Sequence, residues 1–209
     1  FTKKDGLSSN SIRTFAEDFR GNIFIGSTAG VAYVDATMTL HNIDSDWINN
    51  ERILRLVTDA GGSVFGHTGS GNLFSVTTKG VSEYYTSSGL GMKVTTIYPD
   101  PEKPRKLYYG TNNNGVYYGR FGAPTNVLDK IDTGRTKNIH WLHYACGRLW
   151  VSSSMAAGYV DENMTYVPFD SFPMKDSIEM MTSDYQGNIW FASSRAGVMK
   201  LVADNFLDI

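Results

Sequence analysis

The sequence predicts an all-β chain, a β-propeller built of about five four-stranded antiparallel blades. A similar stretch recurs five times, and the apolar residues that open the copies are 41, 41, 45 and 39 residues apart, at Ile12, Ile53, Val94, Ile139 and Ile178. This spacing is typical of four-stranded propeller blades. No segment shows a sustained helical period. One four-stranded sheet would bury too little to be stable alone, so the copies are expected to stack face to face.

Each copy indicates four strands, a to d, in chain order. Strand a is a short apolar run such as RTFAED at residues 13–18. A turn follows, written DFRGN from Asp18 and DYQGN from Asp184, and Asp or Asn beside Gly is the chemistry of a tight hairpin. Strand b is aromatic or β-branched, as in IFIG from Ile23. Strand c follows a small loop, and a more polar strand d ends the copy, which predicts an antiparallel meander.

We expect residues 1–209 to form a single propeller unit. Its blades are predicted at about 8–50, 51–91, 92–135, 136–174 and 175–209. Residues 1–7, FTKKDGL, match YTSSGLG from Tyr85, which leads from one blade to the next. We interpret them as the remnant of a preceding outer strand, and the chain as part of a larger propeller.

Composition narrows the classes of function. The formal net charge is −2, without a basic stripe, so no nucleic-acid partner is expected. The single cysteine, Cys146, cannot form an internal disulfide and is predicted to be a buried or half-buried thiol in a hairpin turn. No motif for catalysis, a cofactor or a metal is present, so none of these is predicted and the chain is not expected to be an enzyme. Any membrane attachment would come through segments outside this sequence.

Two copies carry a resemblance to a known family. The pattern DGLSSNSI…DxxGNIFIGS…GVxxxD, from Asp5 to Asp35, and the pattern SI…DxxGNIWFAS, from Ser177, resemble the two-component-regulator propeller repeat. The second copy keeps Asp59, the third replaces the turn with PDPEKPRK from Pro99, and the fourth lacks the Asp.

The resemblance implies a ligand-sensing domain outside the cytoplasm, periplasmic or extracellular, in a membrane-anchored bacterial receptor. Such a domain passes its signal to a cytoplasmic histidine kinase or cyclase. The implied partner is a small polar or carbohydrate ligand, and a homodimer is compatible with the family.

The order of the strands divides the connections between two ends of the blades. We call the end with the d–a and b–c connections the first face, and the end with the a–b and c–d turns the second face. The repeated Asp18, Asp59 and Asp184 fall on the second face. We interpret them as structural, because an Asp side chain accepts backbone N–H bonds in such turns. Calcium binding is the alternative, but DxxGN lacks the alternating oxygen ligands of a calcium loop.

The first face varies between copies, as a binding surface does. Its d–a connections carry Asn10, Ser11, Glu51, Arg52, Lys93, Lys137, Asn138, Asp176 and Ser177. Its b–c connections carry Thr28, His67, Thr68, Asn112, Asn113, Asn114, Ser153, Ser154, Ser194 and Arg195. Such amides, hydroxyls and charges can hydrogen-bond a small polar ligand. The predicted ligand-binding residues are Arg52, Asn113, His140, Arg195 and Trp47.

Other interpretations remain open. Trp141 lies in a strand and is predicted to pack in the core, whereas Trp47 is expected to be exposed. His140 and His143 should point to opposite faces of their strand, which argues against a shared metal. A glycan hydrolase or lyase would need two carboxylates about 5–10 Å apart, and Glu51, Asp176 and Glu179 are the only plausible set. A protein-interaction scaffold is the third alternative.

Overall fold

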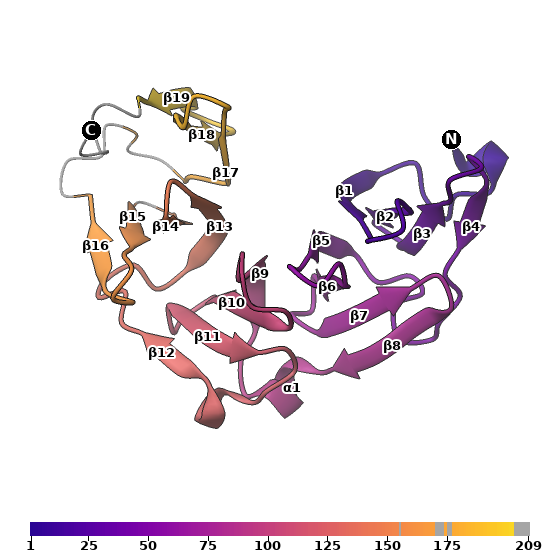
Figure 1. Ribbon diagram of the computed structural model, residues 1–209, viewed down its shortest axis with the longest axis horizontal. Helices are drawn as coiled ribbons and strands as arrows, with labels where there is room; N and C mark the ends of the chain where they lie inside the picture. The colour runs from indigo at the N-terminus through magenta and orange to yellow at the C-terminus, as the bar shows by residue number, and fades with distance from the viewer. Residues whose placement is uncertain (155, 170–173, 175–176, 203–209) are drawn as a thin grey trace. The chain divides into compact units, whose positions relative to one another are not determined.

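A computed structural model describes residues 1–154, 156–169, 174 and 177–202. In this part of the chain, five antiparallel sheets follow one another, and the strands of each sheet pair in chain order (Figure 1). Four of these sheets have four strands, and the last has three. The predicted fold class, an all-β propeller with about five four-stranded blades, is confirmed.

The strands form five blades. The first comprises β1 (Ile12–Glu17), β2 (Ile23–Ser27), β3 (Gly30–Val34) and β4 (Leu40–Asn42). The second comprises β5 (Ile53–Thr58), β6 (Val64–Thr68), β7 (Leu73–Thr77) and β8 (Gly80–Tyr85). The third comprises β9 (Val94–Pro99), β10 (Lys106–Thr111), β11 (Val116–Arg120) and β12 (Asp129–Ile131). The fourth comprises β13 (Ile139–Ala145), β14 (Arg148–Ser153), β15 (Ala157–Val160) and β16 (Tyr166–Pro168). The fifth comprises β17 (Met180–Ser183), β18 (Ile189–Ser193) and β19 (Gly197–Leu201).

In the described part of the chain, helical structure is confined to single turns: η1 (Lys3–Asp5), α1 (Ser87–Leu90) and η2 (Thr125–Val127). Among the residues that the structure describes, no helix could cross a membrane. The matching segments at residues 1–7 and from Tyr85 both contain such a turn. Thr2 and Thr86 cap their N-termini, and each ends at a left-handed glycine. The first seven residues are therefore a helical turn of the kind that follows a d strand, and not the predicted strand.

The chain forms two compact units. Unit 1 comprises Phe1–Leu107 with Gly119–Leu128, and unit 2 comprises Tyr108–Tyr118 with Asp129–Ile209. The core of unit 1 joins the first two blades, since Phe24 of β2, Ile53 of β5 and Phe74 of β7 are fully buried in one cluster. Burial of such side chains is the main stabilising contribution of a sheet protein.

The core of unit 2 joins the last two blades. Trp150 of β14, Ile178 and Phe191 of β18 are fully buried in one cluster, against which Trp141 packs partly buried. The predicted core position of Trp141 is therefore confirmed. The ring of Trp150 lies 5.8 Å from that of Phe169, nearly parallel, and 6.3 Å from that of Phe191, edge-on.

The repeated Asp residues hold the a–b turns, as predicted. One oxygen of Asp18 accepts the backbone N–H groups of Arg20 and Asn22, at 2.8 and 3.0 Å. Asp59 does the same for Gly61 and Ser63, at 3.0 and 2.8 Å. These bonds occupy backbone donors that the tight turn would otherwise leave unpaired.

Two a–b turns depart from the repeated sequence but still close a hairpin. In the third blade, Asp100 is the second residue of the PDPEKPRK segment and accepts the backbone N–H groups of Glu102 and Lys103, both at 2.9 Å. Asp100 therefore takes the part of the repeated Asp in this longer loop. The sequence pattern did not predict this, because the loop lacks the DxxGN spacing. In the fourth blade, Cys146 and Gly147 have φ of 54° and 71°. Two left-handed residues close a hairpin without a capping Asp. Cys146 is half-buried, as predicted.

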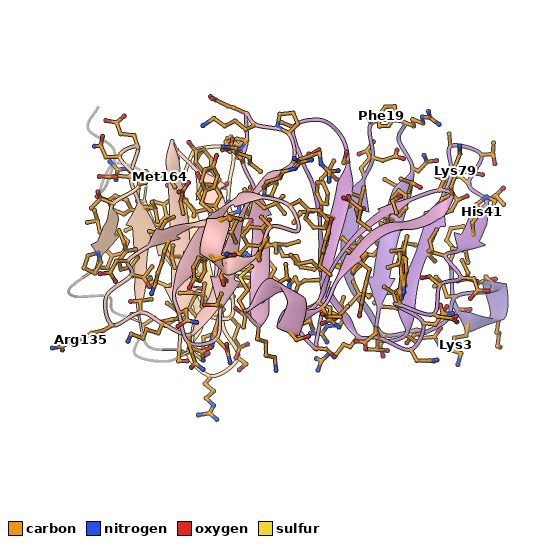
Figure 2. The ribbon with its side chains drawn as sticks, turned by 90° about the horizontal axis from the view of Figure 1, so that it is seen from below. Lys3, Phe19, His41, Lys79, Arg135 and Met164 are labelled. Atoms are coloured by element: carbon orange, nitrogen blue, oxygen red, sulfur yellow. The ribbon has the colours of Figure 1, made fainter. Side chains whose placement is uncertain are left out.

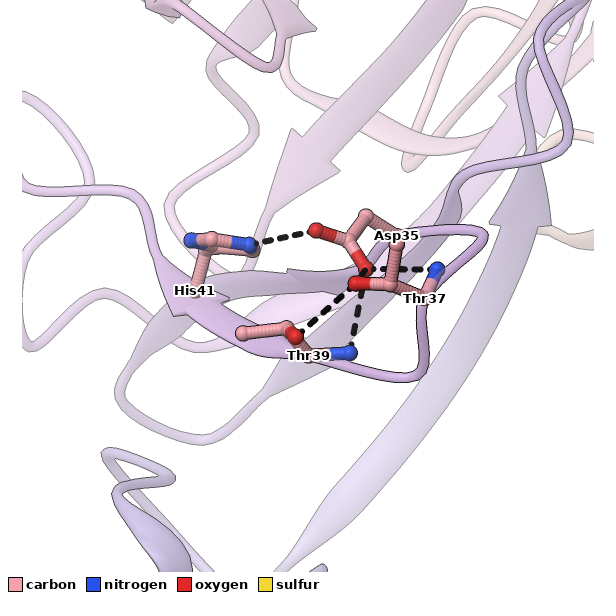
Figure 3. Close-up of polar contacts among 4 residues, drawn as sticks. All are labelled: Asp35, Thr37, Thr39 and His41. Atoms are coloured by element: carbon pink, nitrogen blue, oxygen red, sulfur yellow. Dashed lines mark hydrogen bonds and ion pairs between the residues drawn. The ribbon is translucent and has the colours of Figure 1, made fainter.

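The c–d turn of the first blade has a carboxylate of its own (Figure 3). Asp35 Oδ1 accepts the Thr37 hydroxyl at 2.6 Å and the backbone N–H of Thr39 at 3.0 Å, and His41 Nε2 lies 2.8 Å from Asp35 Oδ2. The hydrogen bonds from Thr37 and His41 hold the pKa of Asp35 well below its usual range. The fourth blade repeats this turn at Asp161, which accepts the backbone N–H of Thr165 at 2.8 Å. Both sequences, DATMT and DENMT, therefore encode the same local structure.

Asp184 in the last blade should make the stability of this protein depend on pH. Hydrogen bonds from the side chains of Asn188 and Trp190 lower the pKa of Asp184 from 3.8 to about 2. A carboxylate whose pKa is lower in the folded state stabilises the fold above the unfolded-state pKa, and this contribution is lost as the pH falls through the folded-state value. We expect Asp184→Asn to lower the melting temperature above pH 4, and the difference from wild type to shrink between pH 4 and pH 2.

Thermal melts monitored by circular dichroism across this range test the expectation. Asp129→Asn is the control, because Asp129 is exposed and its carboxylate accepts no hydrogen bond from the residues that the structure describes. Curves for wild type and Asp184→Asn that stay parallel down to pH 2 would contradict the assignment.

Candidate functional site

On the first face of unit 1, the structure places Arg52 and Trp47 beside strand β5. The side chain of Arg52 is exposed, and its carbonyl accepts the N–H of Gly69 at 2.8 Å. Trp47 is 51% exposed, as predicted, and its ring stacks on Tyr84 at 5.7 Å with an interplanar angle of 16°. The neighbouring Glu51 accepts the Ser70 hydroxyl at 3.3 Å. The stacking holds the Trp47 ring in place and leaves half of its surface available.

On the first face of unit 2, His140 is the centre of a polar cluster. Its Nδ1 lies 3.1 Å from the Ser177 hydroxyl, and its Nε2 lies 3.3 Å from both the Ser154 hydroxyl and the Asn138 amide. Asn138 also donates to Ser154 at 3.2 Å. The structure therefore brings together four first-face residues from two neighbouring blades. The imidazole is half-buried, so it can still meet a ligand.

The other two predicted residues of unit 2 lie outside this cluster. Asn113 and Arg195 are exposed in the b–c connections of the third and fifth blades. The backbone N–H of Arg195 donates to the Ser193 hydroxyl at 3.2 Å, and the residue as a whole is exposed. Asp176 lies outside the described residues.

The prediction that His140 and His143 point to opposite faces is wrong. His143 Nε2 lies 3.0 Å from the Ser183 hydroxyl, so both imidazoles contact residues of the fifth blade. The cause is an irregularity in the pairing of β13 with β14 between Ile139 and Trp141. The extra residue at such a bulge shifts the alternation of side chains. Within the described residues, no three His, Cys, Asp or Glu side chains are grouped so that they could hold a metal ion.

Three residues assigned to the b–c connections belong to strands. His67 and Thr68 end β6 and Ser153 ends β14, and all three are buried. Burial lowers the pKa of His67 to about 3, with a further contribution from the charge of Arg55. Arg55 on β5 is itself buried and donates to the Thr96 hydroxyl at 2.9 Å. This arginine, in the apolar run ILRLVT, was not predicted as a core residue.

A pocket of about 370 Å³ lies on the second face of unit 1. It is lined by residues 18–20, 62–65, 75–79 and 82–83 and by Arg105. Figure 2 shows Phe19 and Lys79 toward one end of this unit and Lys3 at the other, so the pocket opens at the end away from Lys3. None of the residues predicted to bind ligand lines it.

Glu83 organises the inner wall of this pocket. Its two carboxylate oxygens accept the Arg105 guanidinium at 2.9 and 2.8 Å. Oε2 also accepts the Ser75 hydroxyl and Oε1 the Tyr85 hydroxyl, both at 3.1 Å. Partial burial raises the pKa of Glu83. The hydrogen bond and the charge of Arg105, together with the hydrogen bonds from Tyr85 and Ser75, lower it by more, so the net shift is downward. The wall is therefore a fixed, internally neutral ion pair.

The sequence contained one sign of the pocket. The a–b turns read DFRGN, DAGGS and DYQGN, so an aromatic side chain follows Asp18 and Asp184 at a position where the second blade has Ala60. Phe19 is 72% exposed. Tyr185, at the same position of the last blade, is 95% exposed and lines no described pocket, so the aromatic residue alone did not locate the pocket.

Comparisons with known proteins support the fold. The sequence matches no protein-family model, and no curated protein sequence is significantly similar to it. Among solved structures, a streptogramin B lyase superposes with a TM-score of 0.74 at 12% identity, over 93% of this chain and 66% of the lyase. The extracellular domain of a protein described as a hybrid two component system from B. thetaiotaomicron gives 0.71 at 19% identity, over 97% of this chain and 28% of that one.

A second extracellular domain from B. thetaiotaomicron, of a protein described as a one component system, gives a TM-score of 0.70 at 21% identity. It is matched over 94% of this chain and 28% of its own length. The chain thus spans less than two thirds of the length of these proteins. Their likeness to this chain is one of fold, and it is consistent with the resemblance to the two-component-regulator propeller repeat.

Proposed function

We propose that this chain is a ligand-sensing propeller module of a bacterial signal-transduction receptor, placed outside the cytoplasm. The observation that carries the proposal is the agreement of two independent likenesses. The repeat DxxGNI-aromatic resembles the two-component-regulator propeller family. The blades also superpose, over more than nine tenths of this chain, on extracellular domains of B. thetaiotaomicron proteins described as a hybrid two component system and a one component system. Signal transfer to a cytoplasmic kinase or cyclase, and dimerisation of the receptor, belong to the same proposal.

The ligand of this module is a small polar molecule or a carbohydrate. The candidate contacts on the first face are Trp47 and Arg52 in unit 1, and Asn113, His140 and Arg195 in unit 2. The His140 cluster supports this class of ligand best, because hydroxyl and amide groups around a half-buried imidazole offer both donors and acceptors. A half-exposed indole such as Trp47 can cover the apolar face of a sugar ring.

A binding screen on the 209-residue chain tests the proposal. We expect at least one neutral mono- or disaccharide or small polar metabolite to raise the melting temperature of the protein. His140→Ala should lower the affinity for that ligand by about tenfold, since the loss of a hydrogen-bonding side chain costs on the order of 1–2 kcal/mol of binding free energy. His41→Ala is the matched control, because His41 lies on the outer strand β4.

Two outcomes would contradict the proposal. One is a folded protein that responds to no compound of a broad library. The other is a ligand that binds the complete receptor to saturation without changing its kinase or cyclase output. Equal affinity of the His140→Ala and His41→Ala variants would reject the His140 cluster as the binding site and leave the sensing function standing.

A propeller lyase or glycan hydrolase is the second candidate, favoured by the superposition on streptogramin B lyase. Of the three carboxylates predicted for such an enzyme, Glu51 and Glu179 lie among the described residues. Each accepts a serine hydroxyl, Ser70 at 3.3 Å and Ser194 at 2.7 Å. Turnover of a glycan or of a streptogramin that disappears in Glu179→Gln would establish this function, and inactivity of wild type on both would reject it.

A further inference from the structure

The pocket on the second face of unit 1 is shaped by an irregularity in the pairing of β7 with β8. Ser75 pairs with Glu83, but the next pair is Val76 with Val81, so Ser82 is an extra residue. A bulge of this kind turns side chains that a regular strand would alternate. Here, consecutive residues Ser82 and Glu83 both line the pocket. The bulge therefore places two consecutive polar side chains on the wall of the pocket.

The charges around the pocket leave a positive surplus. The charged lining residues, Asp18, Glu83, Arg20, Lys79 and Arg105, sum to +1. Asp18 keeps its charge while it accepts three N–H groups from Arg20 and Asn22, and Glu83 is paired with Arg105. Arg20 and Lys79 are exposed and form no ion pair within the part of the chain that the structure describes. Two cations without a fixed partner favour an anionic ligand over a neutral one.

The remaining lining suits a hydroxylated ring. Phe19 is exposed, with the Arg20 guanidinium 5.0 Å from the centre of its ring. An aromatic ring of this kind covers the C–H face of a sugar. The hydroxyls of Ser63, Thr78 and Ser82 form no hydrogen bond to other described residues, so each can donate to or accept from a ligand. A volume of about 370 Å³ is within the range of small-ligand pockets.

We propose that this pocket binds a sugar acid: a mono- or disaccharide that carries a carboxylate. Arg20 and Lys79 hold the carboxylate at the rim. Phe19 stacks on the ring, and the bulged wall with Ser82 and the Glu83–Arg105 pair bonds the ring hydroxyls. The inference rests on the proposed ligand-binding function, but it assigns a second site, on the other face of the blades, with its own ligand class.

Isothermal titration of the 209-residue chain with glucuronate, glucose and acetate tests this site. We expect glucuronate to bind at least about tenfold more tightly than either glucose, which lacks the charge, or acetate, which lacks the ring. The double variant Arg20→Gln, Lys79→Gln should reduce glucuronate to the affinity of glucose, and either single substitution should weaken it by about threefold. Lys3→Gln, an exposed lysine at the other end of the same unit (Figure 2), is the matched control and should stay within about twofold of wild type.

The melting temperature of each variant shows whether it is folded. If the double variant does not fold, the two single variants test the site. Equal affinities for glucuronate and glucose, or glucuronate binding that the Arg20 and Lys79 substitutions do not change, would overturn the proposal. If glucuronate does not bind, but a neutral sugar does and Arg52→Gln weakens the binding of that sugar, the sensing function stands and only this site is rejected. If no compound binds at all, both are rejected.

Discussion

Replacing Trp150 with alanine is expected to lower the free energy of unfolding by about 3–5 kcal/mol, because removal of a fully buried aromatic side chain loses its transfer free energy and leaves a cavity. Trp150 has no exposed surface, and its ring is surrounded by Tyr159, Phe169 and Phe191 at 5.6 to 6.3 Å. Its indole N–H also donates to the carbonyl of Ala145 at 3.1 Å. The substitution therefore removes packing and a hydrogen bond at the centre of unit 2.

Urea unfolding followed by far-ultraviolet circular dichroism measures this change. Trp150→Phe keeps an aromatic ring in the core, so we expect it to cost less than the alanine substitution. Tyr185→Ala is the control, since Tyr185 is an aromatic residue of the same unit that is 95% exposed. Its effect should lie within about 0.5 kcal/mol of zero. A loss below about 1 kcal/mol for Trp150→Ala would contradict the packing of this core.

The blades could be predicted from the sequence because their chemistry is local. The DxxGN turn joins two strands within a few residues, and the carboxylate of Asp18 bonds the backbone of that same turn. Such a unit leaves the same pattern each time it occurs. Where the turn is built otherwise, as at Asp100 and Cys146, the pattern disappears although the hairpin remains.

The pocket could not be predicted because it is assembled over long sequence distances. Phe19, Ser82 and Arg105 come from three different blades and meet only through the packing of unit 1. The bulges are equally hard to predict, because one extra residue interrupts the alternation of side chains within a short strand and so turns side chains such as His140. The sequence therefore indicated which residue types vary between copies, but not which of them lie at one site.

One position in strand b explains how the first two blades approach each other. The next-to-last residue of this strand is small in four copies, Gly26, Gly110, Ser152 and Ala192, and is the buried His67 in the second. A Cβ on Gly26 would lie 2.5 Å from Thr14 Cγ2 and 2.8 Å from Ile53 Cγ2. Thr14 belongs to the same blade and Ile53 to the next one. The missing side chain therefore lets β5 pack directly against β2.

We expect Gly26→Ala to lower the free energy of unfolding by about 1–3 kcal/mol, because a methyl group forced into a filled core displaces its neighbours. Chemical unfolding of the variant measures the loss. Gly69→Ala is the control, because the nearest atom to its Cβ would be 3.7 Å away and its φ lies outside the left-handed region. There the added methyl should be neutral or stabilising by about 0.4–1 kcal/mol, through the lower entropy of the unfolded chain.

Thr14→Ser identifies the cause of the loss at Gly26. It removes Cγ2, the atom nearest to the new methyl, and keeps the hydroxyl that accepts the N–H of Leu56 at 2.9 Å. If steric overlap with Thr14 is the cause, Gly26→Ala should cost less in the Thr14→Ser background than in wild type, with a coupling of about 0.5–3 kcal/mol between the two sites. If the effects of the two substitutions on the free energy of unfolding are strictly additive, the added methyl is opposed by Ile53 instead. If Gly26→Ala leaves the free energy of unfolding unchanged in both backgrounds, the close approach of the first two blades is contradicted.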